Sequence, residues 1–181
     1  VEGDTFHYKI PPIIPVIQSV SIDTITGNVT ITWGEDSSPD TYGYIVYNQD
    51  INGFFVNLDT VWGQASTSYT YNPAVTGPLQ FSVAAFDSCF TNQTTATFQT
   101  SAKSKVHTSN FLKGKLDICA QQVILDWTDY IGWDAVKDYK VYGYSTGNPY
   151  SVMADTSNAS EVVLNVNSAT TYCFVIQANS T

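Results

Sequence analysis

The chain contains no arginine, because all seven of its basic residues are lysine. They are outnumbered by 16 acidic residues, so the formal net charge of the 181-residue chain is −9. A nucleic-acid partner requires basic side chains that displace counterions from the phosphates. The composition therefore excludes nucleic acid as an expected partner.

Long apolar runs are also absent. No stretch approaches the roughly 18–20 apolar residues that a membrane-spanning helix needs, and the longest candidate, Ile10–Ile17, contains three prolines. We therefore expect no membrane span. Charged residues make up only 13% of the chain and aromatic residues 14%, a balance that excludes both a disordered tail and a coiled coil.

Motifs for catalysis or cofactor binding are scarce. The two histidines, His7 and His107, are a hundred residues apart, and neither a glycine-rich phosphate loop nor an EF-hand loop occurs. Carboxylates that could serve glycoside hydrolysis or calcium binding gather near two corresponding loops: Glu35, Asp36 and Asp40, then Asp126, Asp129, Asp134 and Asp138. We interpret them as solvated loops, and expect no enzyme, no catalytic residue, no metal and no cofactor.

What the sequence does contain is strand periodicity. Several short runs alternate apolar and polar residues, are rich in β-branched and aromatic side chains, and are bounded by turn-forming residues. No window shows sustained helical spacing of apolar residues. The pattern predicts an all-β protein whose strands include residues 29–33, 44–47, 80–84, 123–127 and 139–142.

The strand pattern occurs twice. Trp33 ends an alternating run, and Trp127 ends another 94 residues later. Two further landmarks recur at offsets of 95 and 93, namely Tyr44–Tyr47 with Tyr139–Tyr142, and Val83–Ala85 with Ile176–Ala178. Such a repeat of about 90 residues predicts two tandem seven-strand-type antiparallel β-sandwiches. We expect Trp33 and Trp127 to anchor the two cores.

The predicted boundaries follow from this repeat. Residues 1–11 form a leading strand or the remnant of a preceding module, residues 12–105 the first sandwich, and residues 106–181 a second that lacks its last strand. An extra strand at one end and a missing one at the other fit a piece of a longer multi-module chain. They also fit donor-strand exchange between subunits, with Phe6, His7, Tyr8, Lys9 and Ile10 as the donor strand.

These landmarks resemble the fibronectin type III module. A tryptophan closes the second strand, a Tyr-x-x-Tyr strand follows, and Tyr172–Asn179 matches the strand in which a tyrosine makes a corner contact and anchors the core. The order of Pro11–Ile22, Asp87–Cys89 and Leu116–Cys119 is similar to tandem modules in large secreted or cell-surface proteins of the Bacteroidetes, associated with gliding motility and type IX secretion. The resemblance implies a fibronectin type III or immunoglobulin-like fold without catalysis.

On that topology, the cysteines suggest a disulfide. Cys119 and Cys173 lie at the same pole of the second sandwich, whereas Cys89 belongs to the first. We therefore expect a Cys119–Cys173 disulfide, with Cys89–Cys119 as the second choice, and an oxidising, extracellular location.

A recognition surface is predicted at one loop. Tyr130 and Trp133 lie in the loop after the second tryptophan strand, where exposed aromatic residues often contact a partner. The alternative is that both rings fold back over the sandwich. Together these features predict a non-catalytic extracellular spacer, adhesion or protein-interaction segment. Its expected partners are other modules, neighbouring subunits, a surface protein or a glycan, and the alternatives are a filament subunit and a carbohydrate-binding segment of a secreted hydrolase.

Overall fold

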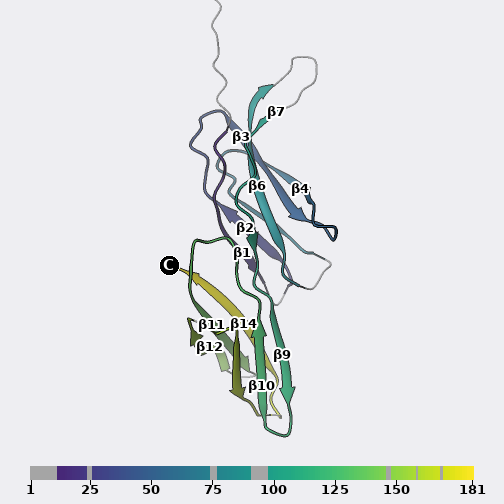
Figure 1. The fold of residues 1–181 in the computed structure, drawn as a ribbon, viewed down its shortest axis with the longest axis vertical. Coiled ribbons are helices and arrows are strands. Elements are labelled where there is room, and N and C mark those ends of the chain that lie inside the picture. Colours follow the sequence, from purple (N-terminus) through teal and green to yellow (C-terminus); the bar gives the residue numbers. More distant parts are fainter. Residues whose placement is uncertain are drawn as a thin grey trace, which may run out of the picture. The chain divides into compact units, whose positions relative to one another are not determined.

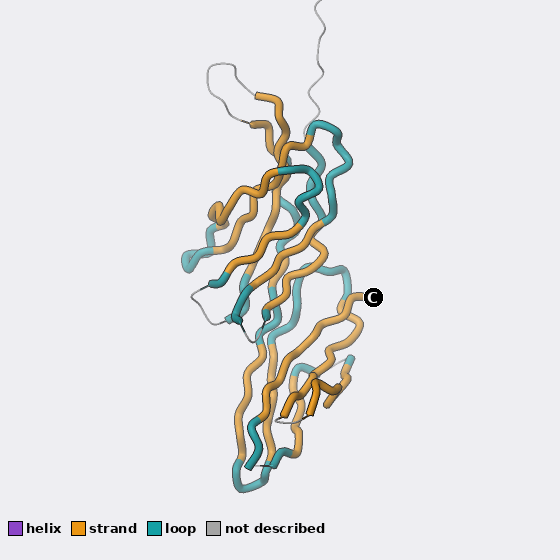
Figure 2. Tube along the Cα trace, turned by 180° about the vertical axis from the view of Figure 1, so that it is seen from behind, coloured by secondary structure: helices purple, strands orange, loops and turns teal. Residues whose placement is uncertain are grey.

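The computed structural model describes residues 12–23, 26–73, 77–90, 98–145, 148–157, 159–167 and 169–181. The regular structure of these residues consists of strands joined by loops and turns, without a helix (Figure 2). No helix that could cross a membrane therefore occurs in this described part. The prediction of an all-β fold is confirmed. The proposed donor strand, Phe6–Ile10, lies outside the described residues.

The strands of the first half surround one core (Figure 1). They are β1 (Ile17–Ile22), β2 (Val29–Trp33), β3 (Thr41–Gln49), β4 (Phe55–Trp62), β5 (Ser68–Tyr71), β6 (Gln80–Phe90) and β7 (Phe98–Thr100). One sheet has the order β1-β2-β5, and the other contains the path β4-β3-β6-β7.

Alternate residues of these strands build the core, because successive side chains of a strand point to opposite faces. Val29, Ile31 and Trp33 of β2 are fully or almost fully buried, as are Tyr44 and Val46 of β3. The Trp33 and Tyr44 rings pack 5.4 Å apart between centroids. The residues that are apolar at every second position in the sequence are therefore the residues that are buried in the structure.

The second half repeats this arrangement. Its strands are β9 (Leu112–Asp117), β10 (Gln122–Trp127), β11 (Val136–Ser145), β12 (Asn148–Thr156), β13 (Glu161–Asn165) and β14 (Tyr172–Ser180). The short strand β8 (His107–Thr108) precedes them and is not part of their two sheets. The antiparallel sheets have the orders β13-β10-β9 and β12-β11-β14. They match β5-β2-β1 and β4-β3-β6 of the first half, so both halves are sandwiches of one type. No strand of the described residues continues the second sheet beyond β14.

The core of the second half uses the equivalent residues. Val123, Leu125 and Trp127 of β10 are buried against Tyr139 and Val141 of β11. The Trp127 and Tyr139 ring centroids lie 5.7 Å apart, close to the 5.4 Å of the first pair. The repeated landmarks in the sequence thus mark a repeated core contact.

Tyr172 lies at the start of β14 and is half-buried. Its hydroxyl accepts a hydrogen bond from the Asn167 backbone N–H at 3.3 Å, and its ring stacks on Phe174 with centroids 5.9 Å apart. A tyrosine hydroxyl bonded to backbone a few residues upstream is the geometry of a tyrosine corner.

The chain forms two compact units. The first comprises Val1–Val20, Thr30–Thr70 and Phe81–Lys105, and the second Ser21–Val29, Tyr71–Gln80 and Val106–Thr181. Each unit is treated separately below.

Candidate binding surface

Four aromatic side chains of the first unit gather into one group, which we call the aromatic cluster: Tyr42, Trp62, Phe86 and Phe98. The closest pairs are Phe86–Phe98 and Trp62–Phe86, with centroids 5.1 and 5.2 Å apart. Tyr42 meets Trp62 edge-on at 5.5 Å. Every ring of the cluster contacts the other three, so the rings support one another.

The aromatic cluster lies on the outer face of its sheet. Gly43 is paired with Trp62 on one side and with Phe86 on the other, and directly paired residues share a face. The next residue, Tyr44, points into the core against Trp33. Gly43, Trp62 and Phe86 therefore face away from the core.

Glycine at position 43 makes room for the cluster. A Cβ atom there would lie 2.8 Å from Cζ of Phe86 and 2.4 Å from the Val61 carbonyl oxygen. The Phe86 ring thus lies directly over the backbone of Gly43, and it is 1% exposed although it belongs to the outer face. Phe86 serves as a base on which the other rings are held.

Two rings of the cluster remain open to solvent. Trp62 is 56% exposed and Tyr42 is 49% exposed. Tryptophan and tyrosine are the residues most often found as anchors of recognition surfaces, because each buries a large area with little loss of conformational freedom. The exposed Trp62–Tyr42 pair is therefore the strongest candidate for a binding surface among the described residues.

The equivalent position in the second unit is polar. Tyr44 and Tyr139 occupy equivalent core positions, so Gly43 corresponds to Asp138. The residue paired with Gly43 is Phe86, whereas the residue paired with Asp138 is Asn179. Both sheets also have a register shift immediately before this position, between Thr41 and Gly43 and between Val136 and Asp138.

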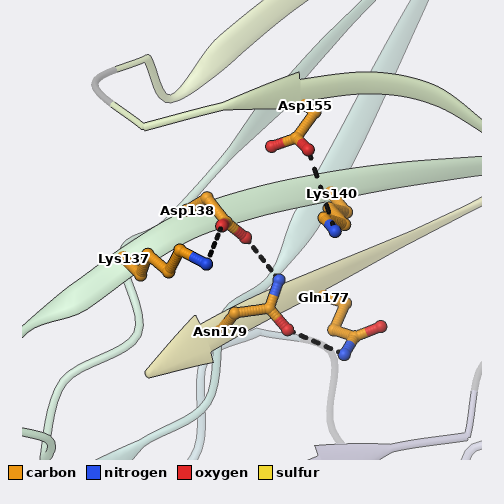
Figure 3. A network of polar contacts seen from close by, with 6 residues as sticks. All are labelled: Lys137, Asp138, Lys140, Asp155, Gln177 and Asn179. Atoms are coloured by element: carbon orange, nitrogen blue, oxygen red, sulfur yellow. Dashed lines mark hydrogen bonds and ion pairs between the residues drawn. The ribbon is translucent and has the colours of Figure 1, made fainter. Parts of the chain in front are cut away.

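A network of polar contacts covers this second surface (Figure 3). The Asn179 side-chain amide donates a hydrogen bond to Asp138, and Gln177 Nε2 donates to Asn179 Oδ1 at 2.9 Å. Lys137 forms an ion pair with Asp138 at 3.9 Å, and on the neighbouring strands Lys140 pairs with Asp155 at 3.8 Å. The fold thus tolerates a polar outer face at this register, so the cluster is not a requirement of the fold.

The acidic residues of the first loop play a structural part. The Asp36 carboxylate, in a residue that is 5% exposed, accepts hydrogen bonds from the Ile13 and Ser38 N–H groups and from Thr41 Oγ1. The Asp36 N–H donates to the Tyr44 hydroxyl at 2.8 Å. Asp36 thus fixes the loop. Glu35 lies exposed beside it, and no group of three or more potential metal ligands occurs among the described residues.

The loop of the second unit repeats one of these bonds. The Tyr130 N–H donates to the Tyr139 hydroxyl at 2.9 Å, as the Asp36 N–H does to Tyr44. The other acidic residues, Asp126, Asp129 and Asp134, are exposed.

We expect the two buried tyrosines to make the protein sensitive to alkali. Burial raises the pKa of Tyr44 and of Tyr139 above the ordinary value of 10.0. The folded protein therefore keeps these protons at a pH where the unfolded chain loses them. Their contribution to stability is complete below about pH 10 and is lost as the pH rises above it.

Thermal unfolding between pH 8 and 11.5 measures this effect. The melting temperature of the wild type should fall above pH 10 more steeply than that of a Tyr44→Phe, Tyr139→Phe double variant, which has neither titrating group. Lysine titration is common to both proteins and so cancels. If the melting temperatures of the two proteins fell equally steeply above pH 10, the effect could not be assigned to Tyr44 and Tyr139.

The aromatic loop predicted as a recognition surface is folded back. Tyr130 is 5% exposed, its ring stacks on Trp133 with centroids 4.0 Å apart, and its hydroxyl lies 2.8 Å from His107 Nδ1. Trp133 is half-buried. Tyr130 is thus a buried contact of its own unit and not an exposed anchor, because the His107 segment offers its hydroxyl a partner.

The predicted Cys119–Cys173 disulfide is not formed in the structure, where both thiols are free and exposed. Tyr172 and Phe174 stack on each other, and the strand alternation turns Cys173 to the opposite face. Cys119 lies in the turn between β9 and β10, which belong to the other sheet. The Cys173 side chain therefore points away from the sheet that carries Cys119.

Sequence reasoning missed all four residues of the aromatic cluster. A comparison of the two repeats contains the signal that could have found them. At an offset of 95, Tyr42 corresponds to Lys137, and at an offset of 93, Phe86 corresponds to Asn179. Positions that are aromatic in one copy and polar in the other are not core positions, so they point to a surface with a separate role.

Known proteins that are similar to the chain are found among solved structures. No family model matches the sequence, and no curated protein matches it. Among solved structures, the chain is similar to the FN1–FN3 domains of chicken CNTN1, with 16% identity and a TM-score of 0.36 over 94% of this chain and 60% of that one. It is also similar to a segment of two fibronectin type III domains from chicken tenascin, with 12% identity and a TM-score of 0.34 over 94% and 91% of the two chains.

Proposed function

We propose that the chain is a non-catalytic interaction segment of a secreted or cell-surface protein, and that the aromatic cluster is its binding surface. The observation that carries the proposal is the contrast between the two units at one position of the sheet. Around Gly43 the first unit presents Trp62 and Tyr42, whereas around the equivalent Asp138 the second unit presents charged and amide side chains. Exposed aromatic rings cost solubility, so their presence at this position in one copy favours a binding role.

The extracellular location is part of the same proposal. A net charge of −9 suits solubility outside the cell, and the module type predicted from the sequence motifs is common in extracellular chains. The link to Bacteroidetes surface proteins of motility and secretion rests on those motifs alone. The sequence that flanks this segment in its gene tests that link.

A binding comparison between variants tests the proposal. The full chain and a Trp62→Ala, Tyr42→Ala double variant are applied to arrays of extracellular proteins and of glycans. We expect at least one ligand to bind the wild type and to be lost by the double variant. A Lys137→Ala variant, altered on the equivalent face of the second unit, should bind like the wild type.

Circular dichroism and the melting temperature show whether the double variant is folded. Both altered side chains are about half exposed, so the fold should be retained. If no ligand binds the wild type, or if every ligand binds the double variant equally well, the cluster is not a binding surface.

A further inference from the structure

We propose that the aromatic cluster binds a neutral carbohydrate, with the apolar face of a sugar ring lying against Trp62 or Tyr42. This inference rests on the function proposed above and names its ligand class. Four features carry it: the exposure of the two rings, their support, the chemistry of the adjoining surface, and the charge of the chain.

The two exposed rings are held in fixed positions. Trp62 contacts Phe86 at 5.2 Å and Phe98 at 6.0 Å, and Tyr42 contacts the same two rings at 6.2 and 6.0 Å. Phe86 is buried and lies over Gly43, so the base of the cluster does not move freely. A surface that is ordered before binding loses little entropy when a ligand arrives, which matters most for weakly bound sugars.

The surface beside the rings carries a hydroxyl group. The next outward row pairs Ile45 with Thr60 on one side and with Ala84 on the other. In the following row, Tyr47 is paired with Asn57. Thr60 and Trp62 share a face two residues apart, about 7 Å along the strand. A hydroxyl group at that distance can bond a hydroxyl of a sugar that lies on the Trp62 ring, and the Asn57 amide lies one row further along the same face.

Size favours a small ligand over a protein. Trp62 and Tyr42 are each about half exposed, and together they present on the order of 200 Å² of ring surface. A stable protein interface buries about 800 Å² on each partner. One or two sugar rings match the smaller area.

Charge favours a neutral sugar over an anionic one. The chain carries a net charge of −9 and has no arginine for bidentate contacts with sulfate or carboxylate groups. Lys103, whose Nζ lies 4.4 Å from the Tyr47 ring centroid, carries a point charge and cannot make such a bidentate contact. Acidic polysaccharides are therefore the poorer match.

Titration with oligosaccharides tests the inference. The full chain is titrated with neutral hexasaccharides built from glucose, xylose, mannose and N-acetylglucosamine, and with heparin as the anionic comparison, using calorimetry and tryptophan fluorescence. Trp62 is more exposed than the core pair Trp33 and Trp127, so binding at the cluster should change the exposed part of the emission. We expect at least one neutral hexasaccharide to bind and heparin not to bind.

Variants locate the site. Trp62→Ala and Tyr42→Ala should each weaken neutral-sugar binding at least tenfold, and Trp62→Phe, which keeps a ring, should retain part of the affinity. Trp133→Ala, altered in the half-buried tryptophan of the second unit, and Lys137→Ala should bind like the wild type. Circular dichroism confirms that each variant is folded.

Three results would overturn the inference: no neutral hexasaccharide binds, heparin alone binds, or Trp62→Ala binds as tightly as the wild type. These are distinguishable from failure of the proposed function. A protein ligand that depends on Trp62 and Tyr42, in the absence of sugar binding, would leave the binding surface standing and reject only its carbohydrate ligand. If neither a protein nor a sugar bound in a way that depends on Trp62 and Tyr42, both the binding surface and its carbohydrate ligand would be rejected.

Discussion

Replacing Trp33 with alanine is expected to destabilise the first unit by about 3–5 kcal/mol, the range for truncating a large buried aromatic side chain. Trp33 is 1% exposed and packs on Tyr44, whose hydroxyl accepts the Asp36 N–H and donates to the Gln64 carbonyl oxygen at 2.8 Å. The substitution therefore opens a cavity beside the group that fixes the loop. Since a domain is typically stable by only 5–15 kcal/mol, much of the unit's stability would be lost.

Hydrogen exchange measured by mass spectrometry on the full chain localises this effect. Protection should fall in peptides from β2, β3 and β6 of the Trp33→Ala protein, while peptides from β10 and β11 stay protected. Trp62→Ala, which removes the same side chain from a position 56% exposed, is the matched control and should change protection little. Unchanged protection in β2 and β3 would show that Trp33 does not anchor the core.

Phenylalanine at position 33 should cost far less than alanine. Among the described residues, the buried Nε1 atoms of both Trp33 and Trp127 have no hydrogen-bond partner. An unsatisfied buried donor costs roughly 1–3 kcal/mol, and Phe removes it while keeping most of the ring volume. A Trp33→Phe variant as unstable as Trp33→Ala would contradict this explanation.

Replacing Gly132 with alanine is expected to destabilise the second unit by several kcal/mol, for two reasons that add. Its φ of +135° is a conformation that L side chains rarely adopt, and such strain costs about 1–3 kcal/mol. A Cβ atom would also lie 2.3 Å from Cγ of His107, a buried ring bonded to the Tyr130 hydroxyl. Overpacking of this kind costs about a further 1–3 kcal/mol.

Thermal melting of five proteins, namely the wild type, Gly132→Ala, His107→Ala, their double variant and Gly34→Ala, separates the two causes. Gly34→Ala is the control, because a Cβ atom there has no neighbour closer than 3.9 Å, and its melting temperature should stay near that of the wild type. A Gly132→Ala, His107→Ala double variant relieves the clash and keeps the backbone strain, so the two substitutions should cost less together than the sum of their separate effects. Full additivity would show that the His107 ring is not what Gly132 accommodates.

The core could be predicted from the sequence because strand burial has a period of two. Trp33 and Trp127 end alternating runs, and each is buried against a tyrosine that follows at nearly the same spacing, Tyr44 or Tyr139. The alternation of apolar and polar residues within one strand shows which of its side chains are buried, even when the pairing of the strands is unknown. The two halves could be recognised for the same reason.

The binding surface could not be predicted in that way. Whether Trp62 faces outward, and whether it meets Phe86, depends on the register of β4 and β6 against β3. That register is set by contacts between strands far apart in the chain, and a shift of one residue reverses every side chain. The sequence left open whether Tyr130 is exposed or folded back for a related reason, since its burial depends on His107, which lies 23 residues earlier.

The register shift shared by the two halves has a consequence for how such repeats diverge. It occurs beside Tyr42 in one copy and beside Lys137 in the other, and the two side chains belong to an aromatic cluster and an ion pair. The same backbone irregularity thus accommodates two different side-chain chemistries. Substitutions in the outer layer at this position can therefore change what the surface binds while the buried layer keeps the fold, so binding and folding can be altered separately in one copy.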